Sequence, residues 1–313
     1  MSRQEHFDLS VVMVNWNSAS LTSVAIESLR ERTAGLDYEL ILIDNGSTRD
    51  DSAALLPARF PWVMFVANPD NRGFSVANNQ GMRMARGRYV LLLNSDTVQT
   101  ENALEKSVRY MDEHSEVGAL GILHLNRDAA RSVQPSFHRF PRPWEEVRGL
   151  LGLGNAGIPG EPAAAALPGE QDVDWVCGSF LLMRRECMEQ VGGLDERFFI
   201  YDEDIDWCLR ARRADWKVRF WPGAAMIHVG AASLPHMRDK TFAHFRSHLT
   251  YIRKNHSLAA AACYYAAMAL RLTGATARQA LRCAGGRATA GDLRERVSRQ
   301  LRFLLLRSSR RGC

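Results

Sequence analysis

The chain has 313 residues, of which 46% are apolar and 24% are charged. These values are ordinary for a globular protein, and they exclude a collagen-like chain, a globally disordered chain and a membrane protein with many spans. The length allows about two domains, or one large α/β unit with an appendage. The net charge of +5 is unevenly spread, because the segment from Arg271 to Cys313 holds eleven arginines and only two acids. A mildly acidic body therefore precedes a basic tail, which indicates an anionic partner such as a membrane surface or a nucleic acid.

Four short, β-rich runs lie in the first hundred residues, and most of them are apolar throughout. Such runs suit strands that are buried on both faces, as in a parallel sheet. Segments that can form helices separate them, so the order predicts a doubly wound α/β unit. The expected strands are Ser10–Val14, Glu39–Ile43, Trp62–Val66 and Tyr89–Leu93, and the expected helices are Leu21–Arg32, Asp50–Phe60 and Ser75–Arg86.

Polar residues rich in Asn and Asp follow each of these four strands. In doubly wound sheets, ligands bind outside the carboxyl ends of the strands. Asn and Asp also favour turns and helix caps, so a single polar end would carry little information. Four such ends in register favour a binding crevice. They are Asn15–Asn17, Asp44–Ser47, Asn68–Asn71 and Asn94–Asp96.

The next part of the chain is less regular. A helix is expected at Glu101–His114, and Asn126–Gln171 is interpreted as a long surface excursion because it is rich in Pro, Gly and Ala. Val173–Arg184 resembles a strand that contains Gly and Ser. An acid-rich helix is expected from Asp202 to Arg213, followed by a short strand at Trp216–Phe220.

From about His236 the chain is expected to be helical. Leu258–Leu270 has no charged residue, but it is shorter than the ~20 apolar residues of a transmembrane helix, which favours a packed or an interfacial helix. Farther on, Leu293, Val297 and Leu301 follow helical spacing, with arginines on the opposite side. This pattern is typical of a basic amphipathic helix, and a solvated helix packed on the body is an equally open alternative.

The familiar phosphate-binding motifs are absent from the sequence. It contains no G-x-x-x-x-G-K-[ST] loop, no G-x-G-x-x-G after the first strand and no G-x-S-x-G elbow. A nucleotide would therefore need its phosphates held in another way, most simply through a divalent metal. The six cysteines form no C-x-x-C pair, and Met1–Ser10 lacks the apolar core of a signal peptide. We therefore expect a cytoplasmic protein with free thiols.

Three residues stand out as candidates for chemistry. Asp96 follows an apolar strand, where a carboxylate suits Mg²⁺ or Mn²⁺, although it could also cap the next helix. Asp204 lies among four acids within five residues; such acids compensate a helix dipole, but crowding also raises a pKa, as a general base requires. His228 follows a Pro-Gly turn, and it could be a structural residue or a ligand of the same metal.

An ordered series of motifs resembles the family 2 glycosyltransferases, which have the GT-A fold. The match covers roughly residues 8–232 and looks most like the branch of bacterial rhamnosyltransferases that build cell-surface polysaccharides. The motifs are Val-Val-Met-Val-Asn-Trp-Asn (11–17), Ile-Asp-Asn-Gly-Ser-Thr-Arg-Asp (43–50), Asn-Pro-Asp-Asn-Arg-Gly-Phe (68–74) with Asn79 and Gly81, Leu-Asn-Ser-Asp-Thr (93–97), Gly-Ser-Phe (178–180), Phe-Phe-Ile-Tyr-Asp-Glu-Asp-Ile-Asp-Trp-Cys-Leu-Arg (198–210), and His228 followed by Gly230 and Ser233.

The resemblance implies an α/β fold of the GT-A type, Rossmann-like with a mostly parallel sheet, and a C-terminal helical extension. The catalytic domain would cover residues 1–235. Within it, about 1–100 would form the nucleotide-binding half and 101–235 the acceptor half. The helical, basic extension would cover residues 236–313.

The resemblance also implies roles for individual residues. Asp204 would be the catalytic base, with Glu203 beside it. Asp96 would bind Mg²⁺ or Mn²⁺, and His228 would complete the metal site. The donor-binding residues would be Asn15, Asp44, Arg72, Gly73, Asn79, Asn94 and Asp96. The residues bordering the acceptor site would be Gly178, Ser179 and Trp207.

The implied reaction is a single displacement that inverts the anomeric configuration. An acceptor hydroxyl, deprotonated by the base, attacks the anomeric carbon opposite the departing nucleoside diphosphate. Asn94 stands where the family has the first acid of its D-x-D motif. Metal dependence is therefore expected to be weaker, and a metal-free mechanism or a non-catalytic scaffold in a polysaccharide assembly complex stays open.

The resemblance suggests the substrates only by class. Rhamnose from dTDP-rhamnose is the expected donor, with a UDP-hexose as the alternative, and the acceptor would be a hydroxyl of a cell-surface polysaccharide or a lipid-linked glycan. A sugar-phosphate nucleotidyltransferase would need a Gly-rich basic loop where Asn15–Ser18 stands. The basic tail is expected to bind an anionic membrane at the inner face of the cytoplasmic membrane, rather than a nucleic acid.

Overall fold

The computed structural model describes residues 7–153, 169–230, 240–284 and 289–304. Contacts divide the chain into two compact units, the first made of residues 1–140 and 160–237, and the second of 141–159 and 238–313. A few features of the sequence patterns lie outside the described residues. They are Ser233, His236 and four of the eleven arginines in the tail, namely Arg287, Arg307, Arg310 and Arg311.

The first unit is built on one large mixed sheet. Its strands follow the order β3-β2-β1-β4-β11-β6-β12-β5, with β7 added to β6 and β9 to β12. Their bounds are β1 Leu9–Asn15, β2 Tyr38–Asp44, β3 Met64–Ala67, β4 Tyr89–Asn94, β5 Thr97–Gln99, β6 Val117–Leu125, β7 Val133–Gln134, β9 Gln171–Asp172, β11 Phe180–Arg184 and β12 Lys217–His228. The first four strands in the chain are parallel, and β11 lies antiparallel between β4 and β6. A separate two-stranded sheet pairs β8 Phe137–His138 with β10 Trp175–Val176.

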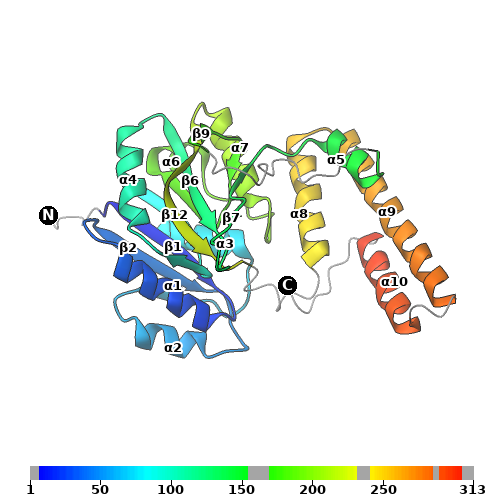
Figure 1. The fold of residues 1–313 in the computed structure, drawn as a ribbon, viewed down its shortest axis with the longest axis horizontal. Helices are drawn as coiled ribbons and strands as arrows, with labels where there is room; N and C mark the ends of the chain where they lie inside the picture. Colours follow the sequence, from blue (N-terminus) through cyan, green and yellow to red (C-terminus); the bar gives the residue numbers. More distant parts are fainter. Residues whose placement is uncertain (1–6, 154–168, 231–239, 285–288, 305–313) are drawn as a thin grey trace. The chain divides into compact units, whose positions relative to one another are not determined.

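Helices cover both faces of this sheet (Figure 1). Neighbouring residues of a strand point to opposite faces, so Val11 and Met13 of β1 join one core while Val12 joins the other. This explains why the strands read as apolar throughout. The first face packs against α1 Ala19–Arg32, α2 Ser52–Arg59 and α4 Ala103–Glu113, and the second against α3 Phe74–Met84, α6 Arg185–Val191 and α7 Glu203–Arg213.

The expected α/β fold with a mostly parallel core is confirmed, but three local expectations need correction. The third strand begins at Met64 rather than Trp62, because β3 is the edge of the sheet and Trp62 lies in the preceding turn. The run Val173–Arg184 is broken at Cys177–Ser179, where the chain turns between β10 and β11. The interval Asn126–Gln171 contains β7, β8 and a helix, so it is more than a surface excursion.

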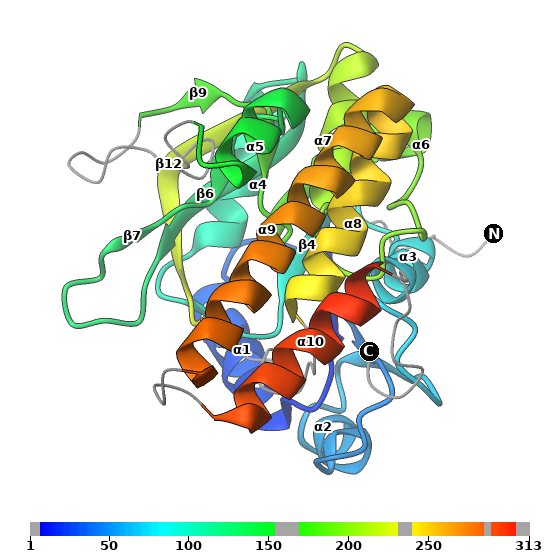
Figure 2. The same cartoon turned by 90° about the vertical axis from the view of Figure 1, so that its right-hand side faces the viewer.

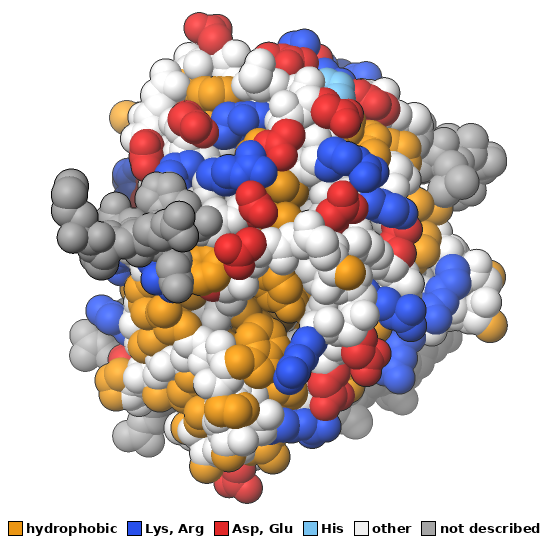
Figure 3. All heavy atoms as spheres, turned by 90° about the vertical axis from the view of Figure 1, so that its left-hand side faces the viewer, with side chains coloured by type: hydrophobic (Ala, Val, Ile, Leu, Met, Phe, Trp, Pro, Cys, Tyr) orange, Lys and Arg blue, Asp and Glu red, His pale blue; other side chains and the backbone are white. Residues whose placement is uncertain are grey.

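The amino ends of the parallel strands carry structural ion pairs. Arg88, just before β4, pairs with Asp8 and Asp112, and Arg86 pairs with the buried Glu39. Figure 3 views the molecule from the side on which the N-terminus lies in Figure 1, and acidic and basic side chains are interspersed there. Among the described residues on this face, no large patch of a single charge sign is seen.

The second unit is helical. It contains α5 Pro143–Leu150, α8 Lys240–Asn255, α9 Leu258–Ala284 and α10 Ala290–Leu304. Its core is aromatic: Phe245 of α8 lies with its ring centre 4.1 Å from that of Phe303 of α10 and 5.8 Å from that of Tyr264 of α9. His248 of α8 lies 2.7 Å from a carboxylate oxygen of Glu146, which ties α5 to the same unit.

Helix α9 is the one helix in the described ranges that is long and apolar enough to cross a membrane, judged by length and composition alone. Its 18-residue apolar window has a mean hydropathy of 1.2, and 22% of that window is buried. The uncharged run ends at Leu270, but the helix continues to Ala284. The expectation that this segment is too short to span a membrane is therefore not supported by the length of the helix.

Candidate active site

The first turn of α7 carries a carboxylate at the carboxyl side of the sheet. Oδ2 of Asp204 accepts a hydrogen bond from the backbone N–H of Gly178 at 2.8 Å, and Oδ1 accepts one from the N–H of Ile205 at 2.8 Å. Tyr201 and Asp202 enter the helix with φ of 71° and 65°, a left-handed conformation that side chains other than glycine rarely adopt. The structure therefore fixes Asp204 against the turn between β10 and β11.

Burial raises the pKa of Asp204 to about 6, and the nearby charge of Asp202 acts in the same direction. The two backbone N–H donors, from Gly178 and Ile205, oppose this shift because they stabilise the charged form. The pKa of Glu203 is raised well above its usual range, first by burial and then by the charge of Asp204. At neutral pH, Asp204 is thus the stronger candidate for a carboxylate that accepts a proton.

A second group of polar side chains gathers where β4 and β12 end and β5 begins. Nε2 of His228 lies 3.3 Å from Oδ1 of Asp96 and 3.5 Å from Nδ2 of Asn94. Pairing of β12 with β5 brings them together, because His228 lies opposite Thr97 and the N–H of Val229 donates to the carbonyl of Asp96 at 2.9 Å. The predicted metal residues Asp96 and His228 are therefore adjacent in the structure.

The two groups share one turn. The backbone N–H of Asn94 donates to the carbonyl of Ser179 at 3.1 Å, and Gly178 beside it binds Asp204. Strands β4 and β11 are paired through Leu93 and Phe180, which holds this arrangement. The raised-pKa carboxylate and the Asp96–His228 pair are thus positioned by neighbouring strands of the same sheet.

The donor set at Asp96 and His228 is compatible with a divalent cation. Within the described residues, no group of three or more His, Cys, Asp or Glu side chains is placed to hold a metal ion. Mg²⁺ and Mn²⁺ commonly take only one or two protein carboxylates and complete their shell with water and substrate phosphates. A carboxylate and an imidazole therefore fit a cation that arrives with a diphosphate.

The predicted nucleotide residues lie in a dense hydrogen-bond network. Nδ2 of Asn15 donates to Asp44 at 2.6 Å, and Oδ1 of Asn15 accepts from the hydroxyl of Thr22 at 2.6 Å. Both Asn15 and Asp44 are buried, at the carboxyl ends of β1 and β2. Asp44 also accepts a hydrogen bond from the hydroxyl of Ser47 at 2.6 Å. This network links the carboxyl ends of the two strands, and we refer to it as the floor.

Asn45 joins this floor to the loop before α3. Its side chain donates to Asn71 at 3.0 Å and to the carbonyl of Gly73 at 3.3 Å, and its oxygen accepts from Asn68 and from the N–H of Arg72, each at 3.2 Å. Gly73 has φ of 90°, and a Cβ there would meet the carbonyl oxygen of Phe199 at 2.8 Å, so the position requires glycine. The Arg72 side chain is exposed beside this loop.

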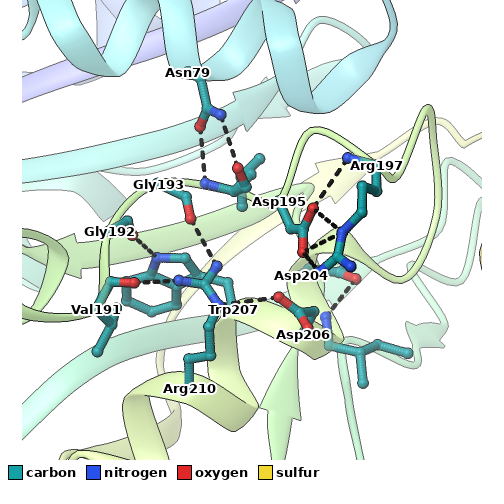
Figure 4. Close-up of polar contacts among 12 residues, drawn as sticks. Asn79, Val191, Gly192, Gly193, Asp195, Arg197, Asp204, Asp206, Trp207 and Arg210 are labelled. Atoms are coloured by element: carbon teal, nitrogen blue, oxygen red, sulfur yellow. Dashed lines mark hydrogen bonds and ion pairs between the residues drawn. The ribbon is translucent and has the colours of Figure 1, made fainter. Parts of the chain in front are cut away.

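Two predicted site residues instead hold the loop that leads to α7 (Figure 4). The amide of Asn79 donates to the carbonyl of Leu194 and accepts from its N–H, both at 2.8 Å. Trp207 is fully buried, and its Nε1–H donates to the carbonyl of Gly192 at 2.9 Å. Trp207 therefore has no exposed surface that an acceptor could contact. The side-chain N–H and C=O groups of Asn79 both bond to the backbone of Leu194 in this loop.

Arg210 completes this support. It donates to the carbonyls of Val191 and Gly193, the latter at 2.7 Å, and pairs with the fully buried Asp206 at 3.0 Å. Figure 4 shows three side chains, Asn79 from α3 and both Trp207 and Arg210 from α7, converging on the 191–194 backbone. The loop is thus rigidly held next to the helix that carries Asp204.

Two residues that the sequence did not indicate complete the centre. His124 of β6 is buried with Nδ1 3.4 Å from the hydroxyl of Ser179, and Oε1 of Gln134 of β7 lies 2.8 Å from Nδ1 of His228. Burial lowers the pKa of His124 to about 3, so its imidazole is neutral. A polar residue within an otherwise apolar strand was the only available signal for His124. Nothing in the sequence pattern pointed to Gln134.

A comparison with known proteins agrees with this geometry. The family model described as "Glycosyl transferase family 2" matches residues 10–166. The chain therefore belongs to glycosyl transferase family 2, and the expectation of a glycosyltransferase is confirmed.

Individual relatives refine the comparison. The chain is 30% identical over 239 residues to the N-acetylglucosaminyl-diphospho-decaprenol L-rhamnosyltransferase of Mycobacterium tuberculosis (strain CDC 1551 / Oshkosh), covering 70% of this chain and 75% of that one. It is 31% identical over 179 residues to the rhamnosyltransferase WbbL of Escherichia coli (strain K12), covering 56% and 66%. The structure of mannosyltransferase PcManGT from Pyrobaculum calidifontis, in complex with GDP-Man and Mn²⁺, aligns with a TM-score of 0.52 at 15% identity, covering 96% of this chain and 86% of that one. These matches confirm the GT-A-like fold.

Proposed function

We propose that this glycosyltransferase inverts the anomeric carbon of a nucleotide-linked sugar, with rhamnose from dTDP-rhamnose as its donor. The acceptor is a hydroxyl of a lipid-linked glycan or cell-surface polysaccharide. One observation carries the proposal: a carboxylate with a raised pKa, Asp204, is fixed to the same turn that binds Asn94 beside the Asp96–His228 pair. Names of the relatives support the choice of sugar and acceptor.

Asp204 acts as the general base in this proposal. Its carboxylate takes the proton of the acceptor hydroxyl while that oxygen bonds to the anomeric carbon and the bond to the diphosphate breaks. Backbone donors from Gly178 and Ile205 hold the carboxylate in place, and a pKa of about 6 leaves it ionised at neutral pH but still basic. One displacement gives inversion. Gly178 and Ser179 border the acceptor side.

Asp96 and His228 would hold Mg²⁺ or Mn²⁺, with Asn94 beside them in place of a second acid. The cation, when bound, supplies positive charge that stabilises the departing nucleoside diphosphate. Having one carboxylate fewer than a D-x-D pair, this site favours a weaker metal requirement. A GT-A structure with a bound nucleotide sugar and Mn²⁺ supports a divalent metal for this fold.

The donor nucleotide is proposed to lie over the floor formed by Asn15 and Asp44, and its diphosphate near Arg72 and Gly73. The exposed Arg72 would add positive charge, while Gly73 lets the backbone approach closely. Asn79 would contribute indirectly, through the loop it holds at Leu194. This assignment keeps the chemistry at the carboxyl ends of the strands, as the doubly wound topology requires.

The second unit is proposed to attach the enzyme to the inner face of the cytoplasmic membrane. Its helix α9 has an apolar stretch, and eleven arginines lie between Arg271 and Cys313. Basic residues near an anionic surface contribute about 1 kcal/mol each. A protein cut after Arg271 is expected to lose flotation with anionic liposomes but to retain donor binding. Equal flotation of both forms would contradict membrane attachment through the tail.

The function is tested by measuring melting temperature with dTDP, UDP or GDP, each with and without Mn²⁺. A ligand at ~100 times its Kd adds about 2.7 kcal/mol, which should raise the Tm by roughly 5 °C for a chain of this size. We expect a Mn²⁺-dependent rise with dTDP, followed by rhamnosyl transfer to a lipid-linked acceptor. A rise only with UDP would replace the donor by a UDP-hexose. No rise with any nucleotide would favour a non-catalytic scaffold.

The matched control is Asp96→Ala. It is expected to remove the Mn²⁺-dependent part of the rise. Because Asp96 is buried beside His228, the rise in each protein is measured against the Tm of that same protein without ligand. If Asp96→Ala keeps the full rise, the metal assignment is wrong even where nucleotide binding is present.

A further inference from the structure

A β-hairpin places an amide beside the predicted metal histidine. Strand β7 pairs antiparallel with β6, with Gln134 opposite His124 and Val133 opposite Leu125. On its other side β6 pairs with β12, the strand that ends in His228. Figure 2 shows β6 and β7 running side by side at the edge of the first unit. Gln134 and His228 are 94 positions apart in sequence, yet Oε1 of Gln134 lies 2.8 Å from Nδ1 of His228.

This contact fixes the protonation pattern of the imidazole. A side-chain amide oxygen only accepts hydrogen bonds, so Nδ1 of His228 must carry a proton and donate it to Gln134. In the tautomer with a single ring N–H, the electron pair then lies on Nε2. That nitrogen is the one turned toward Asp96, at 3.3 Å from Oδ1.

The hairpin around Gln134 is well secured. Its connecting turn is closed by Asn126 and Ser132, whose backbones bond at 2.8 Å, and by Asp128, which accepts from the N–H of Ser132 at 2.9 Å. Beyond Gln134, the hydroxyl of Ser136 donates to the carbonyl of Ile122 on β6 at 2.9 Å. Hydrogen bonds to residues before and after Gln134 in the chain therefore fix the backbone that carries its amide.

The ring of His228 also packs against the ring of His124. The ring centre of His124 lies 5.8 Å from that of His228, with the ring planes inclined at 62°. His124 and Gln134 are opposite each other on β6 and β7. One pair of strands thus supplies both a packing partner and a hydrogen-bond acceptor for His228.

We infer that Gln134 is a positioning residue, which holds His228 with Nε2 directed at the divalent cation. This rests on the proposed function, in which Asp96 and His228 bind that cation. Histidine ligands generally donate their second ring N–H to a carbonyl or carboxylate, and losing that partner typically weakens metal affinity about 10–100-fold. Gln134 acts through His228 and needs no contact with substrate.

The test compares three variants of the full chain. Gln134→Leu keeps the side chain's approximate size but removes the acceptor, Gln134→Glu restores an acceptor, and Gln171→Leu makes the same change at an exposed position of β9. The measured quantity is the Mn²⁺ concentration that gives half of the dTDP-dependent rise in Tm. We expect Gln134→Leu to raise it roughly 10–100-fold, and Gln134→Glu and Gln171→Leu to stay within about threefold of the wild type.

A second readout needs no metal. ¹⁵N spectra of histidine-labelled protein, with the His228 signals assigned by their loss in His228→Asn, should report Nδ1–H in the wild type and in Gln134→Glu. A mixture of tautomers is expected in Gln134→Leu. If Gln134→Leu and the wild type need the same Mn²⁺ concentration, the inference is overturned and the metal site stands. If the wild type shows no Mn²⁺ dependence with any nucleotide, the proposed metal site fails, and the inference with it.

Discussion

Two regions at the carboxyl ends of the sheet differ in how well their polar groups are satisfied. Around Asn15 and Asn45, the side-chain amides have partners for both donor and acceptor atoms. Around Asp204, Oε2 of Glu203 and Nε2 of His124 are buried and have no hydrogen-bond partner. Because a buried polar atom without a partner destabilises the folded state, the first region is preorganised while the second retains unfavourable energy where the reaction is proposed to occur.

The backbone shows the same contrast. The first region reaches positive φ mainly through Gly46 at 73° and Gly73 at 90°, residues without a Cβ. The second reaches it through Tyr201 and Asp202, for which the left-handed conformation is unfavourable. Strain of this kind persists where the surrounding structure enforces it, and it clusters at functional sites. The comparison therefore separates the floor, where the nucleotide is proposed to bind, from the strained turn at Tyr201 and Asp202, which is proposed as the catalytic turn.

The largest expected effect comes from Asp204→Asn. Removing a general base typically lowers kcat about 10²–10⁴-fold. The Asn oxygen can still accept a hydrogen bond from Gly178 or Ile205, so the Tm should not fall. Steady-state transfer rates and thermal melting measure both parts. The control is Asp37→Asn, at an exposed position before β2, which should change neither quantity. If Asp204→Asn keeps its activity, Asp204 is not the general base, and the strained turn has no catalytic role.

On the preorganised side, Asn45→Ala should act on stability. It leaves the partners of a buried amide unsatisfied, which we expect to lower the free energy of unfolding by about 2–3 kcal/mol. Urea denaturation with an unchanged slope measures this loss. Asn102→Ala removes a less buried amide that bonds to the backbone of Ala34, and should lower the free energy of unfolding by about 1 kcal/mol or less. Equal losses of unfolding free energy in the two variants would mean that the hydrogen bonds of Asn45 do not stabilise the floor.

The two regions also differ in how far they can be predicted from sequence. Asn15 and Asp44 end apolar strands, and Asp96 lies two residues after one, so local pattern predicts both the strands and the polar side chains at their ends. By contrast, the partnership of Gln134 with His228 depends on the pairing of β7, β6 and β12, which no local pattern encodes. The burial of Trp207 was missed for a similar reason, because its hydrogen bond to Gly192 crosses from α7 to a loop.

The pH dependence of kcat/KM should report the catalytic turn. The pKa of Asp204 is raised to about 6, so the group is protonated below this pH and cannot accept the acceptor's proton. We expect kcat/KM to fall about tenfold per pH unit below 6 and to level off above about 7. In Asp202→Asn this limb should move to lower pH, because the charge of Asp202 raises the pKa of Asp204. If the acidic side of the kcat/KM profile lies at the same pH in both proteins, the group that titrates is not Asp204.

The smallest effect is expected from Glu203→Gln, which should change the free energy of unfolding. The sign of this change distinguishes Glu203, which is expected to be neutral, from the ionised Asp204. Burial raises the pKa of Glu203 above that of the unfolded chain. The stability that Glu203 contributes is therefore present at low pH and is lost as the pH rises through the folded-state pKa. Gln does not titrate, so the variant should match the wild type near pH 5 and be more stable than it near pH 8. Chemical denaturation at the two pH values measures this difference. A variant that is less stable at pH 8 would mean that Glu203 is ionised and satisfied, and that the strain of this turn resides in Tyr201 and Asp202 alone.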